Sequence, residues 1–197
     1  MGALSPNSER YIALLRLRSE RRIFVIMGVA MSLCAAFWMG WCLLQGIPTA
    51  ALVPGLYIAL AALSLAGLWQ ARTEAVARHT LLLAGLLLPF VFQMILGGTE
   101  RSGLVMLWCL PSLVAAVNVQ RGRFRYGYLA ITGGLLTVFA AFDPMLVDPV
   151  LLEGITTSTL LAFNLGTIMP ANFILADRML AGQRDLRKRV FAIQREA

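Results

Sequence analysis

The sequence has few of the residues on which enzyme and metal sites depend. Among its 197 residues, 14% are charged, and there are one histidine and three cysteines. His79 has no cysteine or carboxylate pattern around it, so we expect it to contact solvent or lipid headgroups rather than a metal or a substrate. Cys34, Cys42 and Cys109 lie within apolar runs and lack metal-ligand spacing. Phosphate loops, nucleophile elbows and zinc motifs are also missing, so the sequence identifies no catalytic residue, metal site or cofactor and leaves enzyme activity undecided.

Charge is also missing from the middle of every apolar run, which bears on transport. Pumps and pores normally place ionisable side chains at mid-membrane depth. The strongly polar residues within the runs are amides, among which Gln93, Asn118 and Asn164 are the candidates for interactions within the membrane. We expect them to form hydrogen bonds between helices, with a contact to a ligand or a lipid as the alternative. A transporter or channel subunit is therefore disfavoured, although it stays among the alternatives.

The sequence is rich in apolar residues, which make up 59% of it, against about half in an average soluble protein. Six runs are long enough to cross a bilayer as helices. They are Ile23–Leu44, Ala50–Leu68, Leu81–Leu96, Gly103–Val119, Tyr126–Phe142 and Ile155–Ala176. The predicted fold is all-α, a polytopic membrane protein with six transmembrane helices. The net charge of +7 comes from short segments between the runs, which favours anionic lipid headgroups over nucleic acid as partners.

The distribution of basic residues predicts the orientation of these spans. With the N-terminus on the cytoplasmic side, sixteen of the seventeen Lys and Arg residues face the cytoplasm, and Arg101 alone faces outward. This bias predicts that both termini are cytoplasmic. The acidic outer segment from Asp143 to Glu153 lacks calcium-loop spacing, so we expect a solvated loop. The predicted parts are a basic arm with an amphipathic helix (residues 1–22), a six-helix domain (23–176) and a cytoplasmic output helix (177–197).

The last quarter of the chain organises the prediction, because the sixth span runs into a charged helix with no loop between them. Residues spaced alternately four and three apart form a seam there: Met179, Gln183, Leu186, Val190, Ile193 and Ala197. The seam predicts a homodimeric coiled coil whose polar Gln183 fixes the register, with a helix lying flat on anionic lipid as the alternative. Asn164 and Pro170 lie on the sixth span and allow it two nearby geometries. Together with Gln93 they are candidates for signal coupling or packing.

Short apolar motifs carry a resemblance to a known family. They are Pro89-Phe90-Val91-Phe92-Gln93 with the following Gly97-Gly98, Ser102-Gly103-Leu104-Val105-Met106-Leu107-Trp108, Phe142-Asp143-Pro144, and the passage from Phe163-Asn164-Leu165 to Gln183-Arg184-Asp185. With them, most of residues 20–190 resembles the six-helix membrane domain that precedes the catalytic domain of bacterial class III adenylate and guanylate cyclases. Related modules precede some histidine kinases and diguanylate cyclases. The resemblance implies a dimeric receptor or anchor in the bacterial inner membrane. The cyclase motifs have no counterpart in this sequence, so no catalytic residue is carried over.

The resulting hypothesis is a membrane sensor or anchor whose sixth helix and rod set the geometry of a cytoplasmic output domain or partner protein. The expected input is a hydrophobic molecule such as a lipid or a quinone, because the outer turns are too short to form a binding domain. One alternative is a structural or assembly subunit of a larger membrane complex, whose rod would bind a fixed partner. A small transporter subunit is another. A membrane enzyme acting on lipids comes last, since the spans hold no acid, base or nucleophile cluster.

Overall fold

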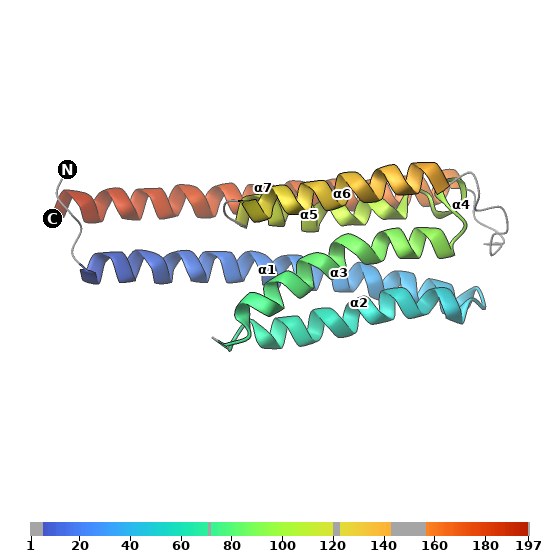
Figure 1. The fold of residues 1–197 in the computed structure, drawn as a ribbon, viewed down its shortest axis with the longest axis horizontal. Coiled ribbons are helices and arrows are strands. Elements are labelled where there is room, and N and C mark those ends of the chain that lie inside the picture. The colour runs from blue at the N-terminus through green and yellow to red at the C-terminus, as the bar shows by residue number, and fades with distance from the viewer. Residues whose placement is uncertain (1–5, 71, 120–122, 143–156, 197) are drawn as a thin grey trace.

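The computed structural model describes residues 6–70, 72–119, 123–142 and 157–196, and every regular element within these ranges is a helix. The elements are α1 (Pro6–Leu44), α2 (Pro48–Gly67), α3 (Glu74–Ile95), α4 (Thr99–Ser102), η1 (Val105–Cys109), α5 (Leu110–Val119), α6 (Arg123–Phe142) and α7 (Thr157–Glu196). The long helices lie side by side in an elongated bundle (Figure 1). α1 begins and α7 ends at the same end, which we call the charged end. We call the opposite end, where α1 meets α2 and α3 meets α4, the turn end.

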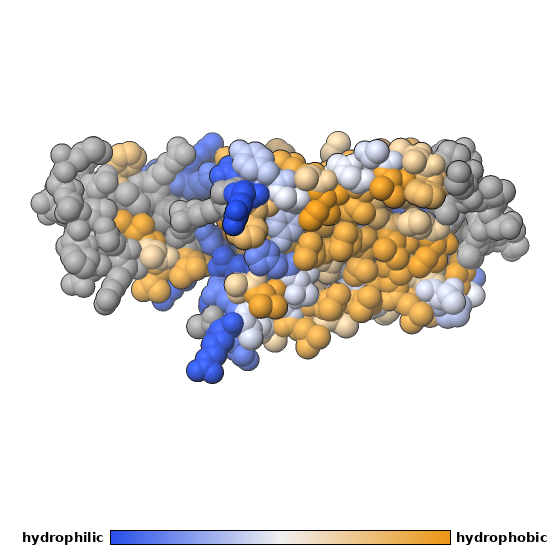
Figure 2. Space-filling view, viewed as in Figure 1, coloured by the Kyte–Doolittle hydropathy of each residue, from blue (hydrophilic) through white to orange (hydrophobic). Residues whose placement is uncertain are grey.

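Four of the helices are long and apolar enough to cross a membrane. The candidate spans are Tyr11–Leu44, Pro48–Gly67, Glu74–Ile95 and Ser158–Asp185. Leu33, Leu52, Leu63 and Phe173 are each more than two thirds exposed, as expected of side chains that face lipid rather than a protein core. Figure 2 shows an apolar belt over the bundle, with hydrophilic residues gathered on the side of the charged end. Length, composition and this belt indicate a membrane-associated helical protein.

The expected fourth span takes a different form from these four helices. Gly103 and Leu104 have left-handed backbone conformations, η1 is a 3-10 helix, and α-helical structure begins only at Leu110. Pro111 therefore lies in the first turn of α5, where its missing N–H has no helical partner to lose. The α-helix of this span is therefore interrupted before Pro111, and Val105–Val119 is a shorter apolar unit.

The expected fifth span corresponds to α6, which has 20 residues but is not among the four candidate spans. Arg123 and Arg125 lie in its first turn, and Gly133 and Gly134 lower the hydropathy of its middle. The acidic segment from Asp143 to Glu153, and the residues of the sixth span before Thr157, lie outside the described residues. Six spans therefore remain a prediction.

α1 and α7 are much longer than their expected spans, at 39 and 40 residues. After Pro6 no proline interrupts α1, so the basic arm continues the same helix past Arg22 instead of forming a separate one. Both helices extend beyond the bundle at the charged end (Figure 1). A Cβ atom on Gly182 would lie 2.9 Å from the Ser19 hydroxyl oxygen, so the two helices approach each other closely at this point, beside a hollow of about 500 Å³ between them.

Candidate functional site

A buried asparagine fastens α7 to the connection between α3 and α5. Asn164 is fully buried, and its Oδ1 accepts a hydrogen bond from Nε1 of Trp108 at 3.1 Å. Its Nδ2 donates to the carbonyl oxygens of Ser102, at 3.1 Å, and of Gly103, at 2.7 Å. One amide thus joins three groups that are 56 to 62 residues away in sequence. We call Asn164, Trp108 and residues 102–104 the α7 clamp.

The backbone geometry of the clamp explains why carbonyl groups are available to Asn164. Gly103 and Leu104 both have φ of 60°, so these two residues form no regular helix between α4 and η1. Leu104 is the single non-glycine residue with positive φ in the described chain. A Cβ atom on Gly103 would lie 2.5 Å from the backbone nitrogen of Leu161, so this turn touches the backbone of α7 directly.

A second buried amide holds the other side of the same connection. Gln93 on α3 is fully buried, and its Oε1 accepts from the backbone N–H of Met106 at 2.8 Å. Its Nε2 is buried without a hydrogen-bond partner. Two of the predicted coupling residues, Gln93 and Asn164, therefore meet on the segment from Ser102 to Met106. Asn118, the third amide considered, is exposed and donates to the Val114 carbonyl of its own helix.

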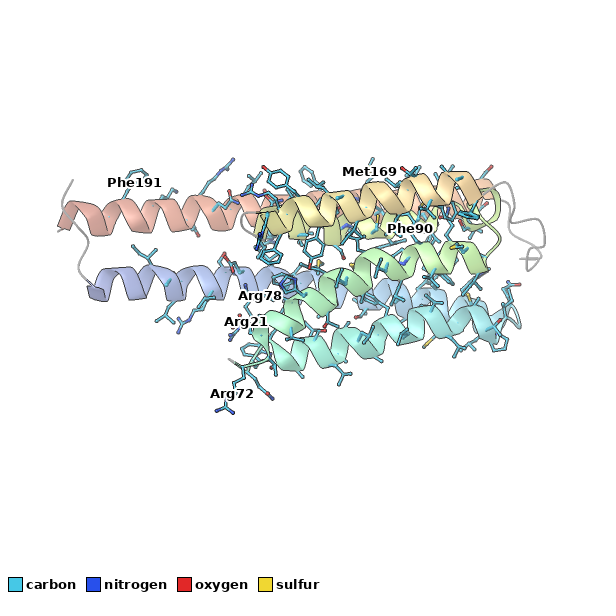
Figure 3. The ribbon with its side chains drawn as sticks, viewed as in Figure 1. Arg21, Arg72, Arg78, Phe90, Met169 and Phe191 are labelled. Atoms are coloured by element: carbon cyan, nitrogen blue, oxygen red, sulfur yellow. The ribbon has the colours of Figure 1, made fainter. Side chains whose placement is uncertain are left out.

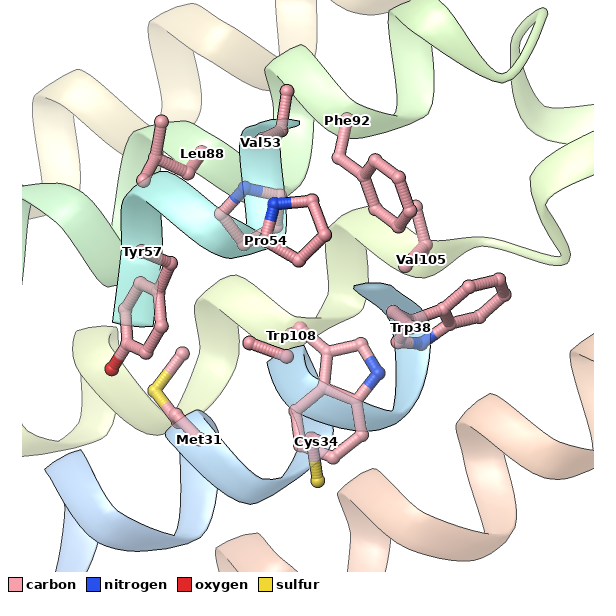
Figure 4. A pocket seen from close by; sticks show the side chains of 12 residues that line it. Met31, Cys34, Trp38, Val53, Pro54, Tyr57, Leu88, Phe92, Val105 and Trp108 are labelled. Carbon is pink, nitrogen blue, oxygen red and sulfur yellow. The ribbon is translucent and has the colours of Figure 1, made fainter. Parts of the chain in front are cut away.

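An apolar cavity of about 50 Å³ lies next to the clamp, between α1, α2, α3 and η1. Its lining residues are Met31, Cys34, Ala35, Trp38, Val53, Pro54, Tyr57, Leu88, Pro89, Phe92, Val105 and Trp108 (Figure 4). Pro54 and Pro89 both lie within helices. A proline inside a helix removes one backbone hydrogen bond and bends the helix, which explains local space between α2 and α3.

A larger hollow of about 370 Å³ lies between α1, α5 and α7. It shares Met31, Cys34 and Trp108 with the smaller cavity, so the Trp108 ring contacts both spaces. Pro170 lines this hollow rather than the clamp, and the structure therefore separates it from Gln93 and Asn164. Trp108, which donates a hydrogen bond to Asn164 on α7, therefore lines both hollows.

The charged end is held by ion pairs between α1 and α3. Arg78 donates to Glu20 at 2.7 Å and to Glu74 at 2.6 Å, and Arg21 donates to Glu74 at 3.1 Å. The Arg21 guanidinium also lies over the Trp69 ring, 5.3 Å from its centroid. Figure 3 shows that Arg21 and Arg78 lie along the bundle, whereas Arg72 projects away from it. We call Glu20, Arg21, Glu74 and Arg78 the charged network.

The remaining sequence candidates for chemistry stay apart from one another. His79 forms a hydrogen bond of 2.7 Å between its Nδ1 and the Tyr128 hydroxyl, and the two rings stack. The three cysteines are free thiols. In the described part of the chain, no group of three His, Cys, Asp or Glu side chains is placed to hold a metal ion.

The predicted dimer seam is described only in part. Met179 is 3% exposed and belongs to a buried cluster with residues of α1, so it packs within its own chain. Gln183 is exposed. The other seam side chains lie outside the described part of the structure: Leu186, Val190, Ile193 and Ala197. The seam as a whole stays a prediction.

Sequence reasoning missed the charged network and the pair of buried donors, Trp38 and Tyr57, beside the cavity. The four-residue spacing of Glu74 and Arg78 predicts one of these ion pairs, because residues four apart are neighbours on a helix. Trp38 and Tyr57 carried no such signal, because they lie on different helices. In comparisons with known proteins, no family model, curated protein or solved structure matches the chain.

Proposed function

We propose that this chain is a receptor or anchor module of the bacterial inner membrane, which dimerises and passes a membrane-derived signal through α7 to a cytoplasmic nucleotide cyclase-type output. The observation that carries the proposal is the α7 clamp. α7 is one helix of 40 residues, and Asn164 near its start is bonded to a turn beside two hollows. A change at these hollows therefore bears on a helix that reaches well beyond the bundle.

The proposed topology has six spans with both termini in the cytoplasm. The unit Val105–Val119 and α6 lie alongside the four long apolar helices in the bundle, which supports six passes (Figure 1). The charged end carries Arg21, Arg78 and Arg123 and also the two helix extensions. An excess of basic residues marks the cytoplasmic side of membrane proteins, so this end is assigned to the cytoplasm.

The proposed dimer pairs the α7 extensions of two copies. Leu180 and Phe191 on this extension are 53% and 64% exposed. These two residues lie about 110° around the helix from the predicted seam, so pairing through the seam is supported by the heptad pattern of Gln183, Leu186 and Val190 and not by this exposed face. A ligand that binds one of two rod geometries more tightly by roughly a few kcal/mol shifts the equilibrium between the two geometries substantially.

A fusion tests transmission through the rod. The catalytic domain of a bacterial adenylate cyclase is joined after Ala197, with zero to seven alanines inserted at the junction, in cells without their own cyclase. Cyclic AMP is expected to rise and fall with the number of inserted residues, because each residue rotates the rod by about 100°. Equal cyclic AMP from all junctions would contradict transmission through the rod.

A structural or assembly subunit is the second candidate, favoured by the close packing of the extensions at Ser19 and Gly182. Under this alternative the rod is held by its own chain and presents a fixed surface. The two proposals differ in the Asn164→Leu variant of the fusion. The receptor proposal expects a changed cyclic AMP level at equal membrane abundance, and the assembly proposal expects none.

A further inference from the structure

Two buried hydrogen-bond donors beside the apolar cavity have no acceptor among the residues that the structure describes. Trp38 Nε1 and Tyr57 Oη lack hydrogen-bond partners, although the two residues are only 3% and 4% exposed. The third donor in the lining, Trp108 Nε1, donates to Asn164 and differs in this respect. A buried donor without a partner costs about 1–3 kcal/mol, so a guest that supplies an acceptor recovers this cost.

The cavity has the size and lining for such a guest. Its volume of about 50 Å³ is about a third of the ~150 Å³ cavity that takes up benzene, so it holds the end of a guest, a few heavy atoms, and the rest of the guest extends out of it. None of the lining residues is ionisable at neutral pH, and most are aliphatic or aromatic. A charged group would lose its hydration without a counter-charge there, so the lining selects against ions. Figure 4 shows the Trp38 ring at one end of the space and the Tyr57 ring at the other.

We propose that this cavity binds the oxygen-bearing end of a small uncharged apolar molecule, whose carbonyl or ether oxygen accepts a hydrogen bond from one of the two donors, Trp38 or Tyr57, at the ends of the space. The guest reaches the cavity from the surrounding lipid, where such molecules partition. Specificity comes from the two donors, because the apolar walls alone do not distinguish a ketone from a hydrocarbon of the same shape.

Binding at this site gives the α7 clamp a direct contact with the guest. Trp108 lines the cavity and donates to Asn164, so a guest that displaces the indole ring perturbs the bond to α7. That the guest is the signal rests on the proposed function. Binding itself does not, and the test below is independent of any output domain.

Photolabelling of the full chain in lipid nanodiscs tests the proposal. One probe is a short methyl ketone that carries an alkyl diazirine. The matched probe replaces the carbonyl oxygen with a CH2 group and so keeps the shape without the acceptor. Labelled peptides are mapped by mass spectrometry. We expect the ketone to label α1 and α2 around Trp38 and Tyr57 with saturation, and the hydrocarbon to label exposed residues without saturation.

Conservative variants separate the donors from the general fold. Trp38→Phe and Tyr57→Phe each remove a donor and keep an aromatic ring. The variant that removes the donor to the guest is expected to weaken ketone labelling roughly five- to tenfold, and the other to leave it nearly unchanged. Tyr128→Phe is the matched control, because its hydroxyl bonds to His79 at the charged end. It is expected to leave labelling of the cavity unchanged. Ala35→Leu places a larger side chain in the lining and is expected to abolish saturable labelling.

Three results overturn the proposal. They are equal labelling by both probes, labelling spread evenly over the lipid-facing residues, and unchanged ketone labelling in the Trp38→Phe/Tyr57→Phe double variant. The size-exclusion profile of each variant checks that the variant is folded. The receptor proposal fails separately, if the cyclase fusions give no periodic response while saturable labelling is present.

Discussion

Replacing Asn164 by leucine removes the centre of the α7 clamp while nearly preserving its volume. Three hydrogen bonds are lost, to Trp108, Ser102 and Gly103. At about 0.6 kcal/mol for an average side-chain hydrogen bond in a membrane protein, they sum to about 2 kcal/mol. The Trp108 N–H is left buried without an acceptor, which adds about 1–3 kcal/mol. We expect a loss of roughly 3–5 kcal/mol in the free energy of unfolding, or roughly 6–20 °C in melting temperature.

The assay is unfolding of the purified protein in a mild detergent, followed by circular dichroism. Asn118→Leu is the matched control, because Asn118 is exposed and bonds to its own helix. It is expected to change the free energy by less than about 0.5 kcal/mol. A double-mutant cycle with Trp108→Phe is expected to give a coupling energy of about 0.5–1.7 kcal/mol with Asn164→Leu. Equal effects of the two asparagine variants, or no coupling to Trp108, would refute the clamp.

Two further predictions concern the turn and the charged network. Gly103→Ala places a Cβ atom 2.5 Å from the backbone of α7 at a φ of 60°, so thermal unfolding is expected to show a loss above about 3 kcal/mol. Gly134→Ala, whose Cβ meets nothing within 4 Å, should instead stabilise the helix by about 0.5–1 kcal/mol, and a similar loss at both glycines would contradict the close contact. Arg78→Gln leaves two carboxylates beside each other and is expected to cost about 1–3 kcal/mol in low salt, less in high salt. The exposed Arg72→Gln is its control, and no salt dependence in the difference between them would argue against the ion pairs.

The positions of the helices followed from hydropathy, and the exceptions have local causes. Apolar runs predict four of the helices well, because about 20 consecutive apolar residues are the length that a helix needs to cross a bilayer. Hydropathy did not predict the continuity of α1 through its basic arm. Backbone hydrogen bonding continues through Arg16, Arg18 and Arg21 whatever the polarity of their side chains, and the sequence there has no proline to stop it.

Two residues around the α7 clamp could be singled out from the sequence, but their partners could not. Gln93 and Asn164 stood out as amides within apolar runs, and both are fully buried. Hydrogen bonds between helices were expected for them. They bond mainly to the connection around Gly103, because two successive left-handed residues free its backbone groups. A positive φ at Leu104 has no sequence signal, since leucine rarely adopts that conformation.

The cavity lay beyond the reach of sequence reasoning for a different reason. The hydropathy and periodicity of a sequence do not tell which helices are neighbours. Only the packing of α1 against α2 and α3 brings Trp38 and Tyr57 to the same space. Their lack of acceptors is a property of that space and not of either helix.

Disulfide crosslinking of single cysteines in native membranes tests the account most directly, in a variant whose three native cysteines are replaced. Cysteines are introduced one at a time from Met179 to Ile193. The account predicts crosslinks between chains at Gln183, Leu186 and Val190, and none at Met179, which is buried in its own chain. No crosslinks between chains, or the same yield at every position, would contradict the dimeric rod and with it signalling through α7.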